Sequence, residues 1–269
     1  MKTKYVSAPY LLWMMVFIFA PLCLVVYFAF TDKGGNFTLA NLSELTQYAP
    51  VFLRSVMLAG FATMICLAIA YPISYMLSRM TASKQKIMLM LIILPMWMNF
   101  LLRTYAWMSL LERNGIINKF FGLFGIGPFK MINTQGAVIL GMVYNFLPFM
   151  IMPLYTIMLK IDHSLVEAAQ DLGGNIFDVF SKVLWPLSLP GVTTGITMVF
   201  VPSCSTFIIS RMLGGGGNLM IGDLIELQFL GNSYNPNLGS AMSLVLMVLV
   251  LICLSVTNGF ADENTEVTL

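Results

Sequence analysis

One polar stretch near the middle of the chain decides the fold. It reads Asp162-His163-Ser164-Leu165-Val166-Glu167-Ala168-Ala169-Gln170-Asp171-Leu172-Gly173-Gly174-Asn175, and long apolar segments lie on both sides of it. Ser164 is followed three residues later by Glu167, which is the spacing of a capping box and predicts that a helix starts there. Gly173 and Gly174 permit the left-handed conformation that ends a helix. We therefore expect a short helix that stops at a glycine joint.

A second short helix is predicted directly after this joint. Asn175 is placed to cap a helix from Ile176 to about Trp185, and Asp178 falls in its first turn, where the helix dipole favours negative charge. Pro186 marks the point where this element stops or bends into the next apolar segment. The segment 160–186 is thus predicted to be an ordered elbow.

The composition places this elbow in a membrane protein. The chain has 269 residues, of which 58% are hydrophobic and 10% are charged, whereas soluble domains have about 25% charged residues. A spanning helix needs about 20 mostly apolar residues. Continuous apolar runs favour helices over barrel strands, which alternate in polarity. We predict an all-α integral membrane protein with a single transmembrane domain over 1–269 and six spans, at about 8–30, 51–78, 87–111, 136–159, 187–210 and 238–258.

The orientation follows from the first span and from one basic loop. Lys2 and Lys4 precede a run that is too long for a signal-peptide core and lacks a cleavage site. We expect a retained helix with its amino end in the cytoplasm, so that six spans leave both termini and the loop 160–186 cytoplasmic. The loop 79–86 is then cytoplasmic too, and it fits the positive-inside rule because it carries Arg79, Lys84 and Lys86.

Several classes of function are disfavoured. The net charge of +2 and the absence of basic runs interleaved with aromatics argue against nucleic-acid binding. One histidine cannot form an H-E-x-x-H zinc site, and no G-x-x-x-x-G-K-[ST] phosphate loop is present. The span interiors contain no acids that could relay protons. We expect no enzyme activity, and no metal or cofactor in this chain.

The elbow resembles a known motif. The elbow contains Glu167-Ala168-Ala169, then Gly173 after three intervening residues, and then Val183-Leu184-Trp185-Pro186 after nine more, and this pattern resembles the EAA motif of ABC importer permeases. That motif ends in I-x-L-P, so Val183 and Trp185 depart from it but remain apolar. The resemblance implies a type I ABC importer permease fold. It also implies that the elbow is a coupling helix, with Glu167, Ala168, Ala169 and Gly173 docked in a cleft of a separate ATPase subunit.

Three further stretches resemble the PotB-type permeases of spermidine/putrescine importers, namely 94–97 with 103–105, then 143–155, and finally 218–223 with 228–230. The resemblance implies a polyamine substrate and a place in the bacterial inner membrane. Its implied partners are a second homologous permease subunit, two copies of an ATPase that bind ATP and magnesium, and an extracytoplasmic substrate-binding protein. An importer for another small solute, or a secondary transporter that works without ATP, remains the alternative.

A polyamine pathway would need acids for the ammonium groups and aromatic faces for cation–π contacts. Trp97, Tyr105 and Tyr144 could supply the faces. Asp223 and Glu226 could supply the charges, and their spacing of three puts both on one face if that stretch is helical. The other interpretation is that they are ordinary interface aromatics and solvated loop acids.

Overall fold

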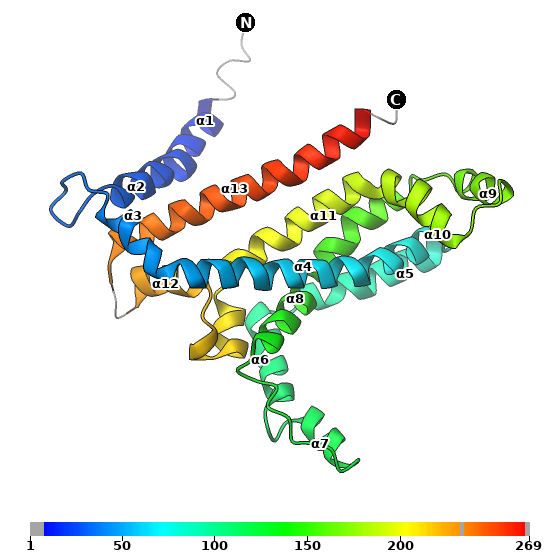
Figure 1. Ribbon diagram of the computed structural model, residues 1–269, viewed down its shortest axis with the longest axis horizontal. Helices are drawn as coiled ribbons and strands as arrows, with labels where there is room; N and C mark the ends of the chain where they lie inside the picture. The colour runs from blue at the N-terminus through cyan, green and yellow to red at the C-terminus, as the bar shows by residue number, and fades with distance from the viewer. Residues whose placement is uncertain (1–7, 232–233, 267–269) are drawn as a thin grey trace, which may run out of the picture.

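The chain forms an elongated bundle of helices, seen in a computed structural model that describes residues 8–231 and 234–266 (Figure 1). Within these residues the regular secondary structure is helical, apart from an isolated bridge between Thr31 and Phe37. Helices long and apolar enough to cross a membrane cover Pro9–Ala29, Ala40–Ser78, Gln135–Met158, Ile176–Ser205 and Pro236–Thr257. A bent pair of helices would make a sixth span. The predicted all-α membrane fold is confirmed.

Three helices make the centre of the bundle: α4 (Ala49–Ser78), α8 (Gln135–Met158) and α11 (Trp185–Ser205), which pack against one another in all three pairs. Small residues bring α11 close to α8. A methyl group added to Gly195 would lie 2.5 Å from the sulfur of Met150. Lipid is as apolar as the side chains, so close backbone packing of this kind drives helix association in membranes.

Hydrogen bonds between helices fix the relative positions of these three. Ser74 of α4 donates its hydroxyl to the carbonyl of Ile151 in α8 at 3.2 Å, and Tyr71 of α4 pairs with Ser188 of α11 at 2.9 Å. Polar side chains at membrane depth need such partners. The three helices therefore form a core to which both ends of the bundle attach.

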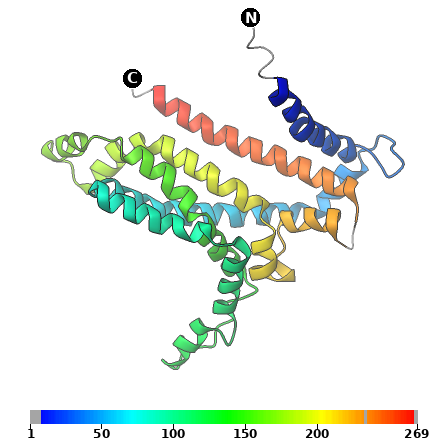
Figure 2. The same ribbon diagram turned by 180° about the vertical axis from the view of Figure 1, so that it is seen from behind.

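The first span and the last helix form an outer layer. The first span consists of α1 (Ala8–Met14), a π turn (Met15–Phe19) and α2 (Ala20–Ala29), and α2 packs against α13 (Pro236–Glu266). Figures 1 and 2 both show α13 between the first span and α11. The amide of Asn237 donates to the carbonyl of Thr31 at 2.7 Å, just beyond the end of α2. The apolar window of the first span is otherwise unburied within the chain.

The third span is broken rather than continuous over 87–111. It consists of α5 (Ala82–Ile93), a 3₁₀ turn (Leu94–Trp97) and α6 (Phe100–Leu111), and the two parts meet at 90°. Pro95 lies in that turn, and the side chain of Asn99 starts α6 by accepting a hydrogen bond from the N–H of Leu101 at 2.8 Å. A proline followed by a strong N-cap ends one helix and begins another. As a result, α6 and α7 (Ile116–Gly122) project away from the bundle (Figures 1 and 2).

The fifth span is also shorter at its carboxyl end than the predicted 187–210. Helix α11 ends at Ser205 because Thr206 turns to an extended conformation with ψ of 137°. A π turn (Ser210–Gly214) and a 3₁₀ turn (Gly216–Asn218) follow, and then α12 (Ile221–Leu230). At this end α3 (Ala40–Glu44) and a 3₁₀ turn (Leu45–Tyr48) lead into α4. The elbow, with α9 (His163–Asp171) and α10 (Ile176–Val179), occupies the opposite end (Figure 1).

Candidate functional site: an elbow and an ion cluster at opposite ends

The first elbow helix starts earlier than the predicted capping box. The N-cap of α9 is Asp162, whose carboxylate accepts a hydrogen bond from the N–H of Ser164 at 3.0 Å. This hydrogen bond holds the pKa of the Asp162 carboxyl below its ordinary value. The carboxylate of Glu167 pairs with Nδ1 of His163 at 2.9 Å instead of reaching back to the backbone. The Ser164–Glu167 capping box is therefore wrong, because a better-placed aspartate precedes it and aspartate is among the strongest N-caps.

The glycine joint has the predicted conformation. Gly173 has φ of +84°, and its N–H donates to the carbonyl of Gln170 at 2.9 Å. The N–H of Gly174 donates to the carbonyl of Ala169 at 3.0 Å. These bonds satisfy carbonyls that the end of α9 would otherwise leave free. The prediction of a positive φ at Gly173 is confirmed.

The second elbow helix is capped as the sequence predicted. The side chain of Asn175 accepts a hydrogen bond from the N–H of Asp178 at 2.9 Å, and the carboxylate of Asp178 accepts one from the N–H of Asn175 at 3.3 Å. Lys182 pairs with Asp178 at 2.7 Å. Its hydrogen bond, together with the bond from the Asn175 backbone, holds the pKa of Asp178 below the ordinary value.

Pro186 neither stops nor sharply bends this element. The chain stays helical from Ile176 to Ser205, because a π turn (Phe180–Leu184) joins α10 to α11. Pro186 is the second residue of α11 and directly follows that π turn. The second elbow helix and the fifth span are therefore one continuous element.

The elbow combines a buried apolar cluster with exposed apolar side chains. The inner cluster consists of Ile161, Val166, Val179 and Leu184, and Tyr75 of α4 and Ala169 pack against it. Three large apolar side chains next to the joint are exposed, Leu172 at 90%, Ile176 at 87% and Phe177 at 75%. Large apolar side chains gathered on a polar segment indicate an interaction surface.

Sequence reasoning missed this exposed apolar set, which we call the apolar joint (Leu172, Ile176 and Phe177). Its signal was present, since all three residues flank the glycine pair. Of the four predicted coupling residues, Glu167, Ala168 and Gly173 are exposed, whereas Ala169 is half-buried against the inner cluster.

The structure does not gather the five predicted pathway residues into one site. Trp97 and Tyr105 are exposed, at the break in the third span and on α6. Tyr144 of α8 is half-buried and packs edge-to-face with Trp107 at 5.3 Å. In the described residues, no hydrogen bond, ion pair or ring contact joins these aromatics to Asp223 or Glu226.

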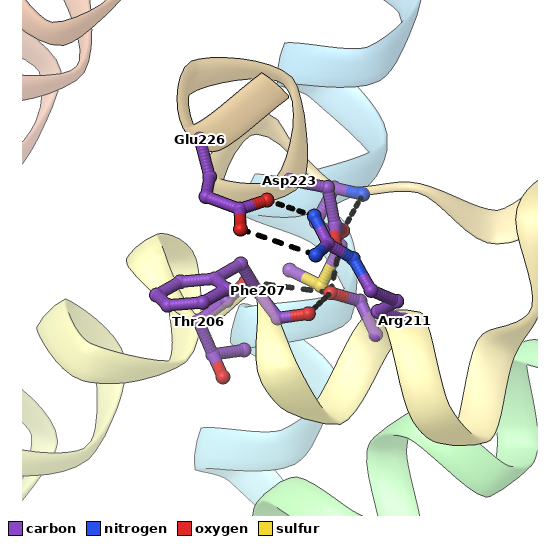
Figure 3. A network of polar contacts seen from close by, with 7 residues as sticks. Thr206, Phe207, Arg211, Asp223 and Glu226 are labelled. Atoms are coloured by element: carbon purple, nitrogen blue, oxygen red, sulfur yellow. Dashed lines mark hydrogen bonds and ion pairs between the residues drawn. The ribbon is translucent and has the colours of Figure 1, made fainter. Parts of the chain in front are cut away.

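The two acids instead meet one arginine at the end of the bundle away from the elbow (Figure 3). Asp223 is fully buried. Its Oδ2 accepts hydrogen bonds from the hydroxyl of Ser210 at 2.6 Å and from the N–H of Met220 at 2.8 Å. Its Oδ1 lies 3.8 Å from Nε of Arg211. Burial raises the pKa of Asp223 above its ordinary value, so this residue is not a solvated loop acid.

Glu226 is held by the same arginine. Both terminal nitrogens of Arg211 donate to its carboxylate, one of them at 3.1 Å and the other in a shorter contact. The hydrogen bond to Glu226 raises the pKa of Arg211. A guanidinium suits this task because its planar fork matches a carboxylate in two parallel bonds. Within the described part of the chain, no three histidine, cysteine or acidic residues lie together as a metal site.

Helix α4 anchors the segment that carries this cluster. Arg54 donates to the carbonyl of Gly217 at 3.1 Å and also to that of Leu219, and the hydroxyl of Ser55 accepts from the N–H of Ile221 at 2.8 Å. These bonds join residues more than 160 positions apart. The position of α12, and with it the cluster, therefore depends on the core.

Comparisons with known proteins identify relatives of this chain. No family model matches the chain. It is 39% identical to the spermidine/putrescine transport system permease protein PotB of Haemophilus influenzae, over 91% of this chain and 88% of that protein. It is 35% identical to the protein of the same name from Escherichia coli K12, over 91% of this chain and 92% of that protein.

Solved structures agree on the fold. A bacterial ABC transporter that imports the acidic polysaccharide alginate matches with a TM-score of 0.81 at 14% identity, over 97% of this chain and 94% of that one. The alginate transporter bound to its alginate-loaded periplasmic protein matches equally well, over 97% of this chain and 93% of that one. At this identity the likeness shows the fold alone, which is that of an ABC transporter permease.

The predicted place in the bacterial inner membrane is confirmed by these relatives together with the candidate spans. The relatives are transport permeases, which agrees with the prediction that the chain is not an enzyme. At 39% identity over nearly its whole length, the chain belongs to the family of PotB permease proteins of spermidine/putrescine transport systems.

Proposed function

We propose that the chain is the permease subunit of an ATP-driven importer of polyamines. In this proposal the elbow receives the motion of an ATPase and passes it to the fifth span. The observation that carries the proposal is the unbroken helical path from Ile176 to Ser205, with an exposed apolar joint at one end and a membrane span at the other. The substrate class comes from the names of the PotB relatives.

The apolar joint would dock into a cleft on the ATPase subunit. Burying a large apolar side chain contributes about 1.5–3 kcal/mol, which suits Leu172, Ile176 and Phe177 as anchors. Glu167, Ala168 and Gly173 lie on the exposed side of the same elbow and would border that contact. ATP and magnesium would be bound by the partner ATPase.

The complete importer would contain a second, homologous permease subunit, two copies of the ATPase and an extracytoplasmic binding protein. The unburied first span is consistent with a further membrane partner. A periplasmic protein bound to the alginate transporter supports a delivery partner of the same kind.

Both termini would lie on the cytoplasmic side with the elbow; Lys2 and Lys4, which motivated that orientation, lie outside the described residues. Closure of the ATPases on ATP would switch the spans from inward-facing to outward-facing, and hydrolysis would reset them.

The test is uptake by the whole complex in sealed vesicles. Vesicles should accumulate labelled spermidine or putrescine only when ATP and the binding protein are both supplied. Phe177→Ser should reduce ATPase copurification and uptake about tenfold, since it removes an anchor of the docked joint. Phe124→Ser is the matched control, because Phe124 is also an exposed aromatic but follows α7, a helix that lies away from the elbow (Figure 1). Uptake without ATP, or full coupling in Phe177→Ser, would contradict the proposal.

A further inference from the structure

We propose that Glu226 binds one ammonium group of the transported polyamine, and that Arg211 is a tethered cation that occupies this carboxylate until the substrate displaces it. The inference rests on the proposed function for its substrate. It adds a residue that contacts the substrate (Glu226), a side chain that competes for that residue (Arg211), and a role for the arginine.

Glu226 faces a cavity of about 470 Å³ between α11, α12 and α13. Ser205, Ser243 and Phe207 line the same cavity, and most of the remaining lining is aliphatic. Cavities of about 300–1,000 Å³ hold small ligands. A polyamine alternates ammonium groups with methylene chains, so a carboxylate and an aromatic face in an apolar cavity suit it.

The broken fifth span adds to the preference for a cation. Helix α11 ends at Ser205, and both Val201 and Ser205 of its last turns line the cavity. The carboxyl end of a helix carries partial negative charge from its unpaired carbonyls. Interrupted membrane helices commonly use such ends to hold cations.

The cluster contains two acids and one base. Two carboxylates, Asp223 and Glu226, share the single guanidinium of Arg211. Asp223 is completely buried, yet its Oδ1 has no hydrogen-bond partner in the described residues and lies only near the Arg211 Nε. The free Oδ1 of Asp223 therefore offers Arg211 an acceptor when the guanidinium leaves Glu226.

The exposure of the pair permits an exchange. The side chain of Arg211 is 45% exposed and that of Glu226 is 23% exposed, whereas Asp223 has no exposure. Arg211 can therefore release Glu226 while it stays beside Asp223, which is anchored by Ser210 and Met220. An incoming ammonium would then replace the guanidinium at Glu226, so the carboxylate is never left without a cation.

The experiment measures ATP-dependent uptake of labelled spermidine and putrescine by the complete complex in vesicles, together with the amount of assembled complex. Glu226→Gln should raise the half-saturating polyamine concentration about tenfold, since a charge-assisted hydrogen bond is replaced by a neutral one. Glu226→Asp, which keeps the charge, should recover part of that loss. Arg211→Gln removes the positive partner of the buried Asp223 and should lower the amount of assembled complex. In the complex that does assemble, the half-saturating concentration should fall, because the resident competitor is gone.

Two matched controls use the same substitutions elsewhere. Glu112→Gln and Arg113→Gln alter an acid and a base that are exposed at the end of α6, and both should behave as the wild type. The proposal is overturned if Glu226→Gln has the half-saturating concentration of the wild type. It is also overturned if Arg211→Gln and Glu226→Gln raise the half-saturating concentration equally while the complex assembles. The same holds if Arg211→Gln, Glu226→Gln and Glu226→Asp all prevent assembly, since the pair would then be purely structural. A wild-type complex that imports no polyamine would instead overturn the proposed function itself.

Discussion

The two ends of the bundle hold their ionisable side chains in opposite ways. At the elbow, His163 pairs with Glu167 and Lys182 pairs with Asp178, each across one helical turn and mostly in solvent. In the cluster, Arg211 reaches acids 12 and 15 residues away, and one of them is fully buried. The elbow is thus a local structure that presents a surface, whereas the cluster is a tertiary structure held by the core.

This difference predicts different consequences of substitution. Exposed ion pairs contribute little to stability, so changes at the elbow should affect coupling while leaving the bundle intact. Removing one partner from a buried charge is strongly destabilising, so changes beside the cluster should affect folding and assembly as well. Three substitutions separate these outcomes.

The largest effect is expected at Gly222, where α12 meets the end of α11. A methyl group there would clash with the carbonyl oxygen of Ser205 and lie 2.8 Å from that of Thr206. Gly222→Ala should therefore destabilise the permease by about 1–3 kcal/mol, as overpacking against rigid backbone does. The measurement is the thermal midpoint and yield of the complex in detergent. Gly60→Ala is the control, because an added methyl at Gly60 meets nothing within 4 Å; equal behaviour of the two variants would contradict the close contact.

A smaller and purely local effect is expected at Gly173. Its φ of +84° is unfavourable for a β-branched residue, although the space around it is open. Gly173→Val should strain the joint by about 1–2 kcal/mol. Uptake and stimulated ATP hydrolysis should fall, while membrane insertion and the thermal midpoint stay normal. Gly173→Asn should be close to wild type, since asparagine tolerates this conformation; normal coupling in the valine variant would show that the joint conformation is not needed.

The smallest effect distinguishes the observed helix cap from the one expected from the sequence. Asp162→Ala should loosen the first turn of α9, whereas Ser164→Ala should leave it unchanged, because the Asp162 carboxylate is the acceptor. The readout is hydrogen exchange of the α9 amides in the intact complex. A reversed ranking would restore the capping box.

The same cap predicts a pH dependence. The pKa of Asp162 is lower in the folded elbow than its ordinary value, so the folded state binds fewer protons there. Its contribution to stability is therefore present above the ordinary pKa and is lost as the pH falls through the lowered one. Asp162→Asn keeps a capping side chain and should remove this dependence of α9 stability on pH. If α9 in the variant still loses stability in acid, the cap is not the source of the dependence.

Much of the fold follows from the sequence alone. Continuous apolar runs place the helices near 51–78 and 136–159, because a bilayer requires that length and composition whatever the packing. The glycine joint and the Asn175 cap were predictable as well, since each depends on residues within four positions. The Ser164 cap failed within the same stretch because two polar residues, Asp162 and Ser164, were both possible caps and Asp162 was better placed.

Other features were decided only by the tertiary structure. The break at Pro95–Asn99 is decided by the direction of α6, which leaves the bundle, since a proline alone is also compatible with a kinked but continuous span. Pro186 looked like a helix end but lies within a continuous helical path. The burial of Asp223 and the contact of Arg211 with two acids require α4, α12 and the turn after α11 to pack together. The hydrogen bond between Ser55 and Ile221 is one of the contacts that hold them there. Local patterns specify helices and caps because their partners are near in sequence, whereas a shared ion cluster exists only when distant helices pack.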